Sequence, residues 1–293
     1  MRRTPVRSAS PAPQRLRVEL QQLLRRVARE IDRGLQRAPL SPEAIHDLHR
    51  DLRRLAILLS VWERLVPTER SAAVDELSQR LRRLARLVGR VRDRDVTASL
   101  LAPSARGQDP GWGEFLGRLR EDRDAGRELL RAFLTSERQA GLFDRLAETL
   151  EVEPKAGAGR SLERILTEVR HRRQGRVDRA RRKARRDPSA ERLHRLRIRI
   201  RRWRHLAALE AAVGLRRAPN PSPSWQRLQG RLGQLHDLDV ALATVPEELG
   251  SASAAQRLTE RRRRVRLRVR RSLERIGPLP RPAPTPPKRR GRR

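Results

Sequence analysis

The chain of 293 residues contains no cysteine and no tyrosine, and only three of its 70 basic residues are lysine. The lack of cysteine excludes disulfides, thiolate metal sites and cysteine nucleophiles. No apolar run approaches the ~18 residues of a membrane span. The basic N-terminus is not followed by the apolar segment that a secretory signal requires. We therefore expect an intracellular, cytoplasmic protein without a membrane span.

The sequence also lacks the motifs of several common classes of enzyme. The sequence has no phosphate-cradling GxxxxGK[ST] loop, no GxSxG elbow and no spacing that supports a Ser/His/Asp triad. Aromatic residues make up only 2% of the chain. Because single-stranded nucleic acids are usually bound by stacking bases on aromatic side chains, this scarcity disfavours that class of binder. We expect a protein that is not an enzyme and has no cofactor.

What the chain has in excess is positive charge, with a formal net charge of +35. Codon usage in a GC-rich genome accounts for arginine over lysine, but not for twice as many basic as acidic residues. A charge of this size predicts a polyanionic partner: nucleic acid, an anionic membrane surface or polymeric phosphate. Arginine suits phosphate in particular, because its planar guanidinium binds two oxygens at once.

Composition divides the chain into a folded body and two basic ends. Residues 1–13 and 277–293 are rich in proline and arginine and are predicted to be disordered. Removing their nine basic residues leaves a net charge of +26 on the body. Between the ends, Leu, Val and Ile recur at spacings of three and four over 14–276, which predicts an all-α fold of eight to ten helices. Ser41-Pro42 and Asp187-Pro188-Ser189 are typical helix starts.

Two of these helices carry the same polar pattern, 148 residues apart. Positions 0, 3, 7 and 10 of the later copy are His194, Arg197, Arg201 and Arg204; those of the earlier copy are His46, His49, Arg53 and Ala56. At about 100° per residue these positions share roughly 80° of a helix face. A single basic stripe is commonly a solvated face with salt bridges to its neighbours. Its duplication in matched register favours a paired site for an extended anion.

A second pattern, G-x-x-[RH]-D-x-D-V, also occurs twice, at Gly89–Val96 and Gly233–Val240. Each copy follows its His/Arg stripe by about 42–46 residues, so order and spacing are both kept. This predicts two duplicated halves, about 14–151 and 160–276. We expect each half to form an antiparallel helical bundle, with the two related by a pseudo-twofold axis.

The aspartates of the second pattern have two interpretations. Paired carboxylates can hold Mg²⁺ with a phosphate substrate. On one helix, however, residues two apart point about 200° away from each other and cannot share an ion. We therefore expect Asp93, Asp95, Asp237 and Asp239 to form structural ion pairs with arginine. A metal on His46 and His49 is disfavoured by the surrounding arginines, and no metal site is predicted.

The runs HRLRIRIRRWRHLAALE (194–210), LQGRLGQLHDLDV (228–240) and LARLVGRVRDRDV (84–96) resemble the signature of the CHAD family, the conserved-histidine α-helical domain. The resemblance covers about 14–276. It implies two pseudo-symmetric bundles with a basic groove or pore between them, binding of inorganic polyphosphate, and association with polyphosphate granules in some members. CHAD domains often follow a CYTH domain, whose ExExK pattern matches residues 151–155 here. That match lies in a Pro/Gly loop without following strands, so a stand-alone CHAD domain is expected.

The resemblance also implies a set of anion-binding residues. The polyphosphate-binding residues carried over, with their neighbours, are His46, His49, Arg50, Arg53, Arg54, Arg83, Arg90, Arg92, His194, Arg197, Arg201, Arg202 and Arg204. The family pattern usually has arginine at His49 and a basic residue at Ala56, which predicts that the first stripe binds less strongly. Two alternatives stay open: a nucleic-acid or nucleoid-associated protein that uses the same charge, and a Mg²⁺-dependent polyphosphate-processing enzyme.

Overall fold

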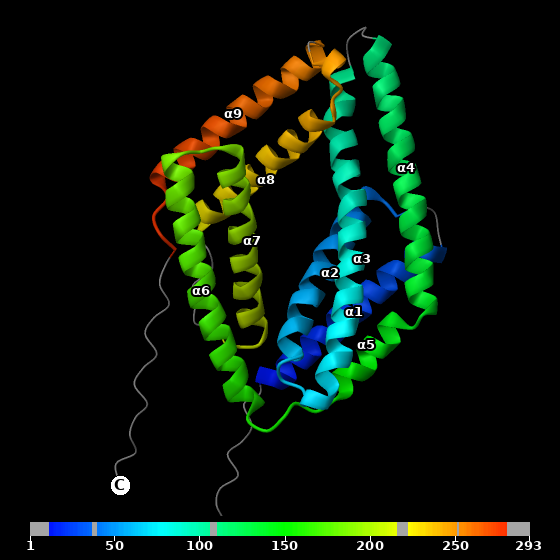
Figure 1. Ribbon diagram of the computed structural model, residues 1–293, viewed down its shortest axis with the longest axis vertical. Helices are drawn as coiled ribbons and strands as arrows, with labels where there is room; N and C mark the ends of the chain where they lie inside the picture. The colour runs from blue at the N-terminus through cyan, green and yellow to red at the C-terminus, as the bar shows by residue number, and fades with distance from the viewer. Residues whose placement is uncertain (1–11, 37–39, 106–109, 216–221, 251, 280–293) are drawn as a thin grey trace, which may run out of the picture.

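The computed structural model describes residues 12–36, 40–105, 110–215, 222–250 and 252–279, and within these ranges the chain is helical throughout (Figure 1). The helices are α1 (Ala12–Gln36), α2 (Pro42–Trp62), α3 (Thr68–Leu101), α4 (Pro110–Gln139), α5 (Leu142–Glu151), α6 (Ala158–Arg186), α7 (Ala190–Ala212), α8 (Pro223–Thr244) and α9 (Ser253–Arg275). Two short 3₁₀ helices, Ala102–Ala105 and Glu247–Leu249, follow α3 and α8. The predicted all-α class is confirmed. None of the described helices is long and apolar enough to cross a membrane.

The two repeat helices begin where their sequence signals predict. Ser41 is the N-cap of α2, and its Oγ accepts a hydrogen bond from the Ala44 N–H at 3.2 Å. Pro42 then occupies the first helical position, where its missing N–H leaves no intrahelical bond unmade. Ser189 is the N-cap residue of α7. Both helices are thereby fixed at the turn from which their His/Arg stripe starts.

An apolar stripe lies beside each cationic stripe and fixes how the helix is rotated. In α7 the buried apolar residues are Leu193, Leu196, Ile200, Trp203, Leu206 and Leu209; in α2 they are Ile45, Leu48, Leu52, Leu55, Leu58, Leu59 and Trp62. Most of these residues immediately precede a stripe position, so the cationic stripe lies about 100° around the helix from the core. Packing the leucines therefore presents the cations along the edge of the core. Trp62 and Trp203 are also core residues.

The buried apolar residues of the described chain form two clusters, and α3, α4, α6 and α7 each extend into both. α3 gives Val74 to Val91 to the first cluster and Leu101 to the second. α6 gives Leu162 and Leu166 to the first cluster and Val177 to the second. The cores therefore do not coincide with the two halves of the sequence, because α3 and α6 tie each half to the core of the other. The twofold relation between the halves stays a prediction.

The ordered body is longer at both ends than the sequence predicts. Ala12 and Pro13, placed in the disordered arm by their composition, are buried in the first turn of α1. Leu279, placed in the disordered tail, is also buried; its N–H donates to Asp178 and its carbonyl accepts from Gln174. In both places the backbone or an apolar side chain packs on a neighbouring helix, which composition alone does not reveal. The rest of the predicted arm (1–11) and tail (280–293) lies outside the described residues.

The predicted boundary between halves falls in the connection from α5 to α6, and the ExExK pattern lies in this region. Glu151 ends α5, and Glu153 pairs with Arg17 at 2.7 Å. The Lys155 N–H donates to the Leu65 carbonyl at 2.9 Å. These contacts fasten the connection to the first half, and the described residues around it contain no strand.

A buried ion pair between α6 and α7 gives the first prediction. Arg170 Nε donates to Glu210 Oε1 at 2.7 Å, with side chains 5% and 2% exposed. Replacing Arg170 with Met removes the charge that this buried carboxylate contacts on α6, so the free energy of unfolding is expected to fall by up to about 3–5 kcal/mol. Arg172→Met on the same helix removes an exposed pair with Glu168 and is expected to change it by at most about 0.5 kcal/mol. Urea denaturation of both variants tests this; equal effects would contradict it.

Candidate anion-binding cleft

Four helices, α2, α3, α6 and α7, enclose an open cleft with a volume of about 890 Å³. Nine arginines line it, together with one histidine and a single carboxylate, Asp93. The basic residues are Arg53, Arg82, Arg86, Arg90, Arg173, Arg176, Arg199, Arg201, Arg202 and His205. The cleft therefore concentrates positive charge from segments that are far apart in the sequence.

The two His/Arg stripes approach each other at this cleft. Arg53 of α2 and Arg201 of α7 both line it, and after burial the charge of Arg53 is the next cause that lowers the pKa of Arg201. His49, next along the first stripe, interacts electrostatically with both of them. Arg90 and Arg202, also expected to bind anions, lie in the same lining. Arg92 and Arg197 lie beside these groups and interact with Arg201. The structure thus brings together most of the central residues that the repeats indicate.

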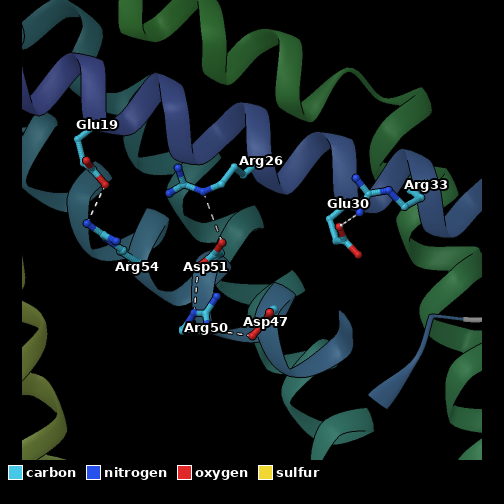
Figure 2. Close-up of polar contacts among 8 residues, drawn as sticks. All are labelled: Glu19, Arg26, Glu30, Arg33, Asp47, Arg50, Asp51 and Arg54. Atoms are coloured by element: carbon cyan, nitrogen blue, oxygen red, sulfur yellow. Dashed lines mark hydrogen bonds and ion pairs between the residues drawn. The ribbon is translucent and has the colours of Figure 1, made fainter. Parts of the chain in front are cut away.

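Other predicted binding residues lie elsewhere. Arg54 pairs with Glu19 of α1 at 2.7 Å, and Arg50 pairs with Asp47 of its own helix at 2.9 Å (Figure 2). Both border a smaller cavity of about 150 Å³ between α2 and α7 rather than the main cleft. Arg83 is exposed on α3 and does not line the cleft.

The ends of the two stripes contact side chains outside the cleft lining. Arg204 donates to Gln229 of α8 at 2.6 Å. The Nδ1 atoms of His194 and His236 are 3.3 Å apart, so these two rings face each other between α7 and α8. His46 accepts a hydrogen bond from Arg92 Nε at 3.3 Å. Of the stronger predicted stripe, only Arg201 lines the cleft itself.

The cleft also contains basic residues that the sequence analysis missed. They are Arg82 and Arg86 of α3, Arg173 and Arg176 of α6, and Arg199 and His205 of α7. On α3 a signal was present, because Arg82, Arg86 and Arg90 recur at i, i+4 and so share one face. Arg173 and Arg176 belong to no repeated pattern. Their position depends on how α6 packs against α7, which the sequence does not specify.

Most arginines that line the cleft have no acidic partner. Among the described residues no carboxylate lies within 4.0 Å of the guanidinium groups of Arg86, Arg90, Arg176, Arg199, Arg201 and Arg202. Arg82 contacts Asp75 only at 3.7 Å, and Arg173 donates to the Arg202 backbone carbonyl at 2.6 Å. Unlike the arginines of an ordinary salt-bridged surface, these groups keep their donors for a ligand.

Burial and crowding perturb the ionisation of this cluster. Burial, together with Arg53 and Arg197, lowers the pKa of the Arg201 guanidinium to about 10, so the group stays charged at neutral pH. Burial and neighbouring arginines also lower the pKa of Arg53, Arg173 and Arg199. All of these groups repel one another, and an anion placed between them removes that repulsion.

The pKa values of the histidines around the cleft are also lowered, and a bound anion would raise them again. Burial, and then Arg53, lowers the pKa of His49 to about 3; burial, and then Arg201, lowers the pKa of His205 to about 4. Burial and Arg197 lower the pKa of His236 to about 4, and burial lowers the pKa of His194. Without a ligand these rings are neutral at pH 7, and each presents one N–H donor.

The aspartates of the repeated G-x-x-[RH]-D-x-D-V pattern contact different helices. Asp95 pairs with Arg127 of α4 at 2.8 Å, and Asp239 pairs with Arg262 of α9 at 2.5 Å. Asp93 pairs with the adjacent Arg92 at 2.8 Å. Asp237 is half-buried beside Arg92 and Arg197, and burial raises the pKa of its carboxyl group. The described residues contain no group of three His, Cys, Asp or Glu side chains placed to hold a metal ion.

The described residues form an all-α fold with a cleft lined by basic residues, and comparison with known proteins gives the family. The CHAD domain model matches residues 19–246. The chain belongs to the CHAD family. No curated protein sequence matches it.

Two solved structures share the fold. A CHAD domain from the plant Ricinus communis has a TM-score of 0.61 and 18% sequence identity, over 95% of this chain and 99% of that one. PptA from Streptomyces chartreusis has a TM-score of 0.58 and 15% identity, over 89% of this chain and 97% of that one. At these identities the likeness concerns the fold alone.

The glycines of the repeated pattern give a prediction about the cleft. A Cβ added at Gly89 would lie 3.1 Å from His49 Nε2, whereas one added at Gly233 meets open space. Gly233→Ala is expected to raise the free energy of unfolding by about 0.5–1 kcal/mol through helix propensity. Gly89→Ala is expected to fall short of that gain and to shift the NMR signals of the His49 ring. Urea denaturation and NMR of both variants check this; identical behaviour would refute the contact.

The depressed histidine pKa values give a prediction about pH. In the unfolded chain His49, His205 and His236 titrate near 6.5, but in the folded protein only near 3 to 4. Between these values the unfolded chain binds more protons, so the free energy of unfolding is expected to fall as pH drops from about 6.5 towards 4. NMR titration of the ring nitrogens measures this directly. Midpoints near 6.5 in the folded protein would show that the rings are not desolvated among arginines.

Proposed function

We propose that this protein binds inorganic polyphosphate in the cleft between α2, α3, α6 and α7 and is not an enzyme. The observation that carries the proposal is the set of half-buried and exposed guanidinium groups that face one cleft without acidic partners. Each can donate charge-assisted hydrogen bonds to phosphate oxygens, and many such contacts together release counterions from the polyanion. Membership of the CHAD family supports the same ligand.

The shape of the cleft favours a thin, linear polyanion. The basic residues come from four helices, and several of them, such as Arg53 and Arg201, are partly buried between helices. A rigid nucleic-acid duplex cannot follow side chains into such a space, whereas a single chain of phosphates can. A compact single anion would contact only a few of these residues. The arrangement therefore suits a flexible polyanion with charge along its whole length.

Nucleic acid is the main alternative ligand. No Trp or Phe is among the described residues that line the cleft, so a single strand would find no aromatic platform for its bases. Binding to nucleic acid would then depend on charge alone and would be non-specific. If polyphosphate is the ligand in the cell, association with polyphosphate granules follows as a further expectation.

Competition between polyanions tests the proposal. Long-chain polyphosphate is expected to bind at ~150 mM salt and to remain bound when duplex DNA or RNA is added at equal phosphate concentration. Fluorescence anisotropy of labelled polyphosphate measures the displacement. If DNA displaces it at equal phosphate concentration, the cleft is a general polyanion surface and the specific proposal is lost.

Variants locate the binding. Arg53→Gln, Arg201→Gln and Arg202→Gln combined remove three guanidiniums from the cleft lining and are expected to weaken binding by roughly a hundredfold or more. The dependence of log K on log salt should also become shallower by about 2–3, since each lost phosphate contact removes about 0.7–0.9.

A matched control removes the same charge elsewhere. Arg172→Gln, Arg192→Gln and Arg195→Gln combined affect arginines that pair with Glu168, Asp187 and Glu191 outside the cleft. This triple variant is expected to bind within about threefold of the parent protein. Equal losses in the two triple variants would show that net charge, not the cleft, carries binding.

Release of phosphate from polyphosphate with Mg²⁺, abolished by Asp237→Ala, would instead favour the processing enzyme.

A further inference from the structure

A second basic pocket lies between α3, α8 and α9, outside the cleft described above. It has a volume of about 410 Å³ and is lined by Val96, Leu100, Gln234, Asp237, Leu238, Arg261, Arg264, Val265 and Arg268. Its three arginines all come from α9, and α9 lies beyond residues 19–246, over which the family model matches. These arginines belong to neither His/Arg stripe, although Val96 and Asp237 of the lining are part of the second repeated pattern.

The three arginines of this pocket differ from several arginines of α9 that form ion pairs. Arg262, Arg263 and Arg270 have acidic partners in Asp239, Glu260 and Glu274. Among the described residues, no carboxylate lies within 4.0 Å of the guanidinium groups of Arg261, Arg264 and Arg268. At i, i+3 and i+7 these three share about 60° of the helix surface. The guanidinium groups of this ridge therefore lack carboxylate partners, as most of those in the central cleft do.

Helix α3 connects the two pockets. Arg82, Arg86 and Asp93 line the central cleft, and Val96 and Leu100 line the α9 pocket. At about 100° per residue, all five fall within about 80° of one face of α3. The two pockets therefore follow one another along the same side of a single helix. From Arg82 to Leu100 this track is about 27 Å long.

The junction between the pockets is where the charges balance. Asp93 pairs with Arg92 at 2.8 Å, and Asp237, which lines the second pocket, lies beside Arg92 and Arg197. Two carboxylates and two guanidiniums meet there, so the junction neither attracts nor strongly repels an anion. A small anion held in the central cleft does not reach across it. Only a chain that crosses the junction contacts both groups of unpaired arginines.

We propose that Arg261, Arg264 and Arg268 form a second phosphate-binding position, continuous with the central cleft along α3 and engaged by polyphosphate chains long enough to span both. This inference rests on the proposed function and adds to it a preference for polyphosphate chains that are long enough to reach both pockets. The α9 ridge adds contacts to a chain already held in the cleft, so its contribution appears as a gain in affinity with length.

The test compares long-chain polyphosphate with tripolyphosphate. Arg261→Gln, Arg264→Gln and Arg268→Gln combined are expected to weaken binding of the long chain about tenfold and to leave tripolyphosphate binding unchanged. Isothermal titration calorimetry at one salt concentration gives both affinities. Loss of tripolyphosphate binding to the same extent would show an independent site for small anions and would overturn the continuous track.

Matched controls separate this inference from the proposed function. Arg263→Gln, Arg266→Gln and Arg270→Gln combined remove the same charge from the opposite side of α9, where the arginines contact Glu260, the Pro188 carbonyl and Glu274. This variant is expected to bind long-chain polyphosphate like the parent protein. If the cleft variant loses binding but the Arg261/Arg264/Arg268 variant does not, the proposed function stands and the track is wrong. If neither loses binding, both are wrong.

Discussion

The structure depends on holding like charges close together. Guanidinium groups of α2, α3, α6 and α7 share one cleft, and mutual repulsion and burial lower the pKa of several of them. What holds them there is the apolar stripe that runs beside each cationic stripe. Burying one Leu or Ile side chain contributes about 1.5–3 kcal/mol, and α7 alone buries six apolar side chains. Leucine packing therefore fixes the helices in an arrangement that their charges oppose.

Helix packing thus holds the arginines of the cleft in place against their mutual repulsion. The arginines cannot spread apart without breaking the core, so an anion that enters gains their combined field without having to assemble it. The histidines are subject to the same surroundings: burial, and then neighbouring arginines, lower the pKa of His49 and His205, so both rings are neutral at pH 7. Ligand charge, helix packing and histidine protonation are therefore coupled, so that a change in any one of them alters the other two.

The sequence predicted the helical class and the starts of α2 and α7, because caps and leucine spacing act locally. It also indicated Arg53 and Arg201, since duplication marks residues that packing alone would not repeat. It could not place Arg173 or Arg176, whose role depends on the packing of α6, nor show that Arg54 contacts Glu19 of α1. Arginines that are close together in the sequence can thus have different partners, because each guanidinium pairs with whichever carboxylate the neighbouring helix places near it.

In a chain with twice as many basic as acidic residues, the position of the acids is therefore the more informative pattern. Arginines occur on most helices, and a binding surface cannot be recognised from them alone. Glu19 of α1 and Asp51 of α2 pair with arginines of α2 (Figure 2), and Asp124 of α4 pairs with Arg123. Along one side of α3 such pairs are few, apart from the balanced junction at Asp93 and Asp237. Where the neighbouring helices provide no acid, the guanidinium groups of the described residues keep no carboxylate partner, and the proposed polyanion site rests on that difference.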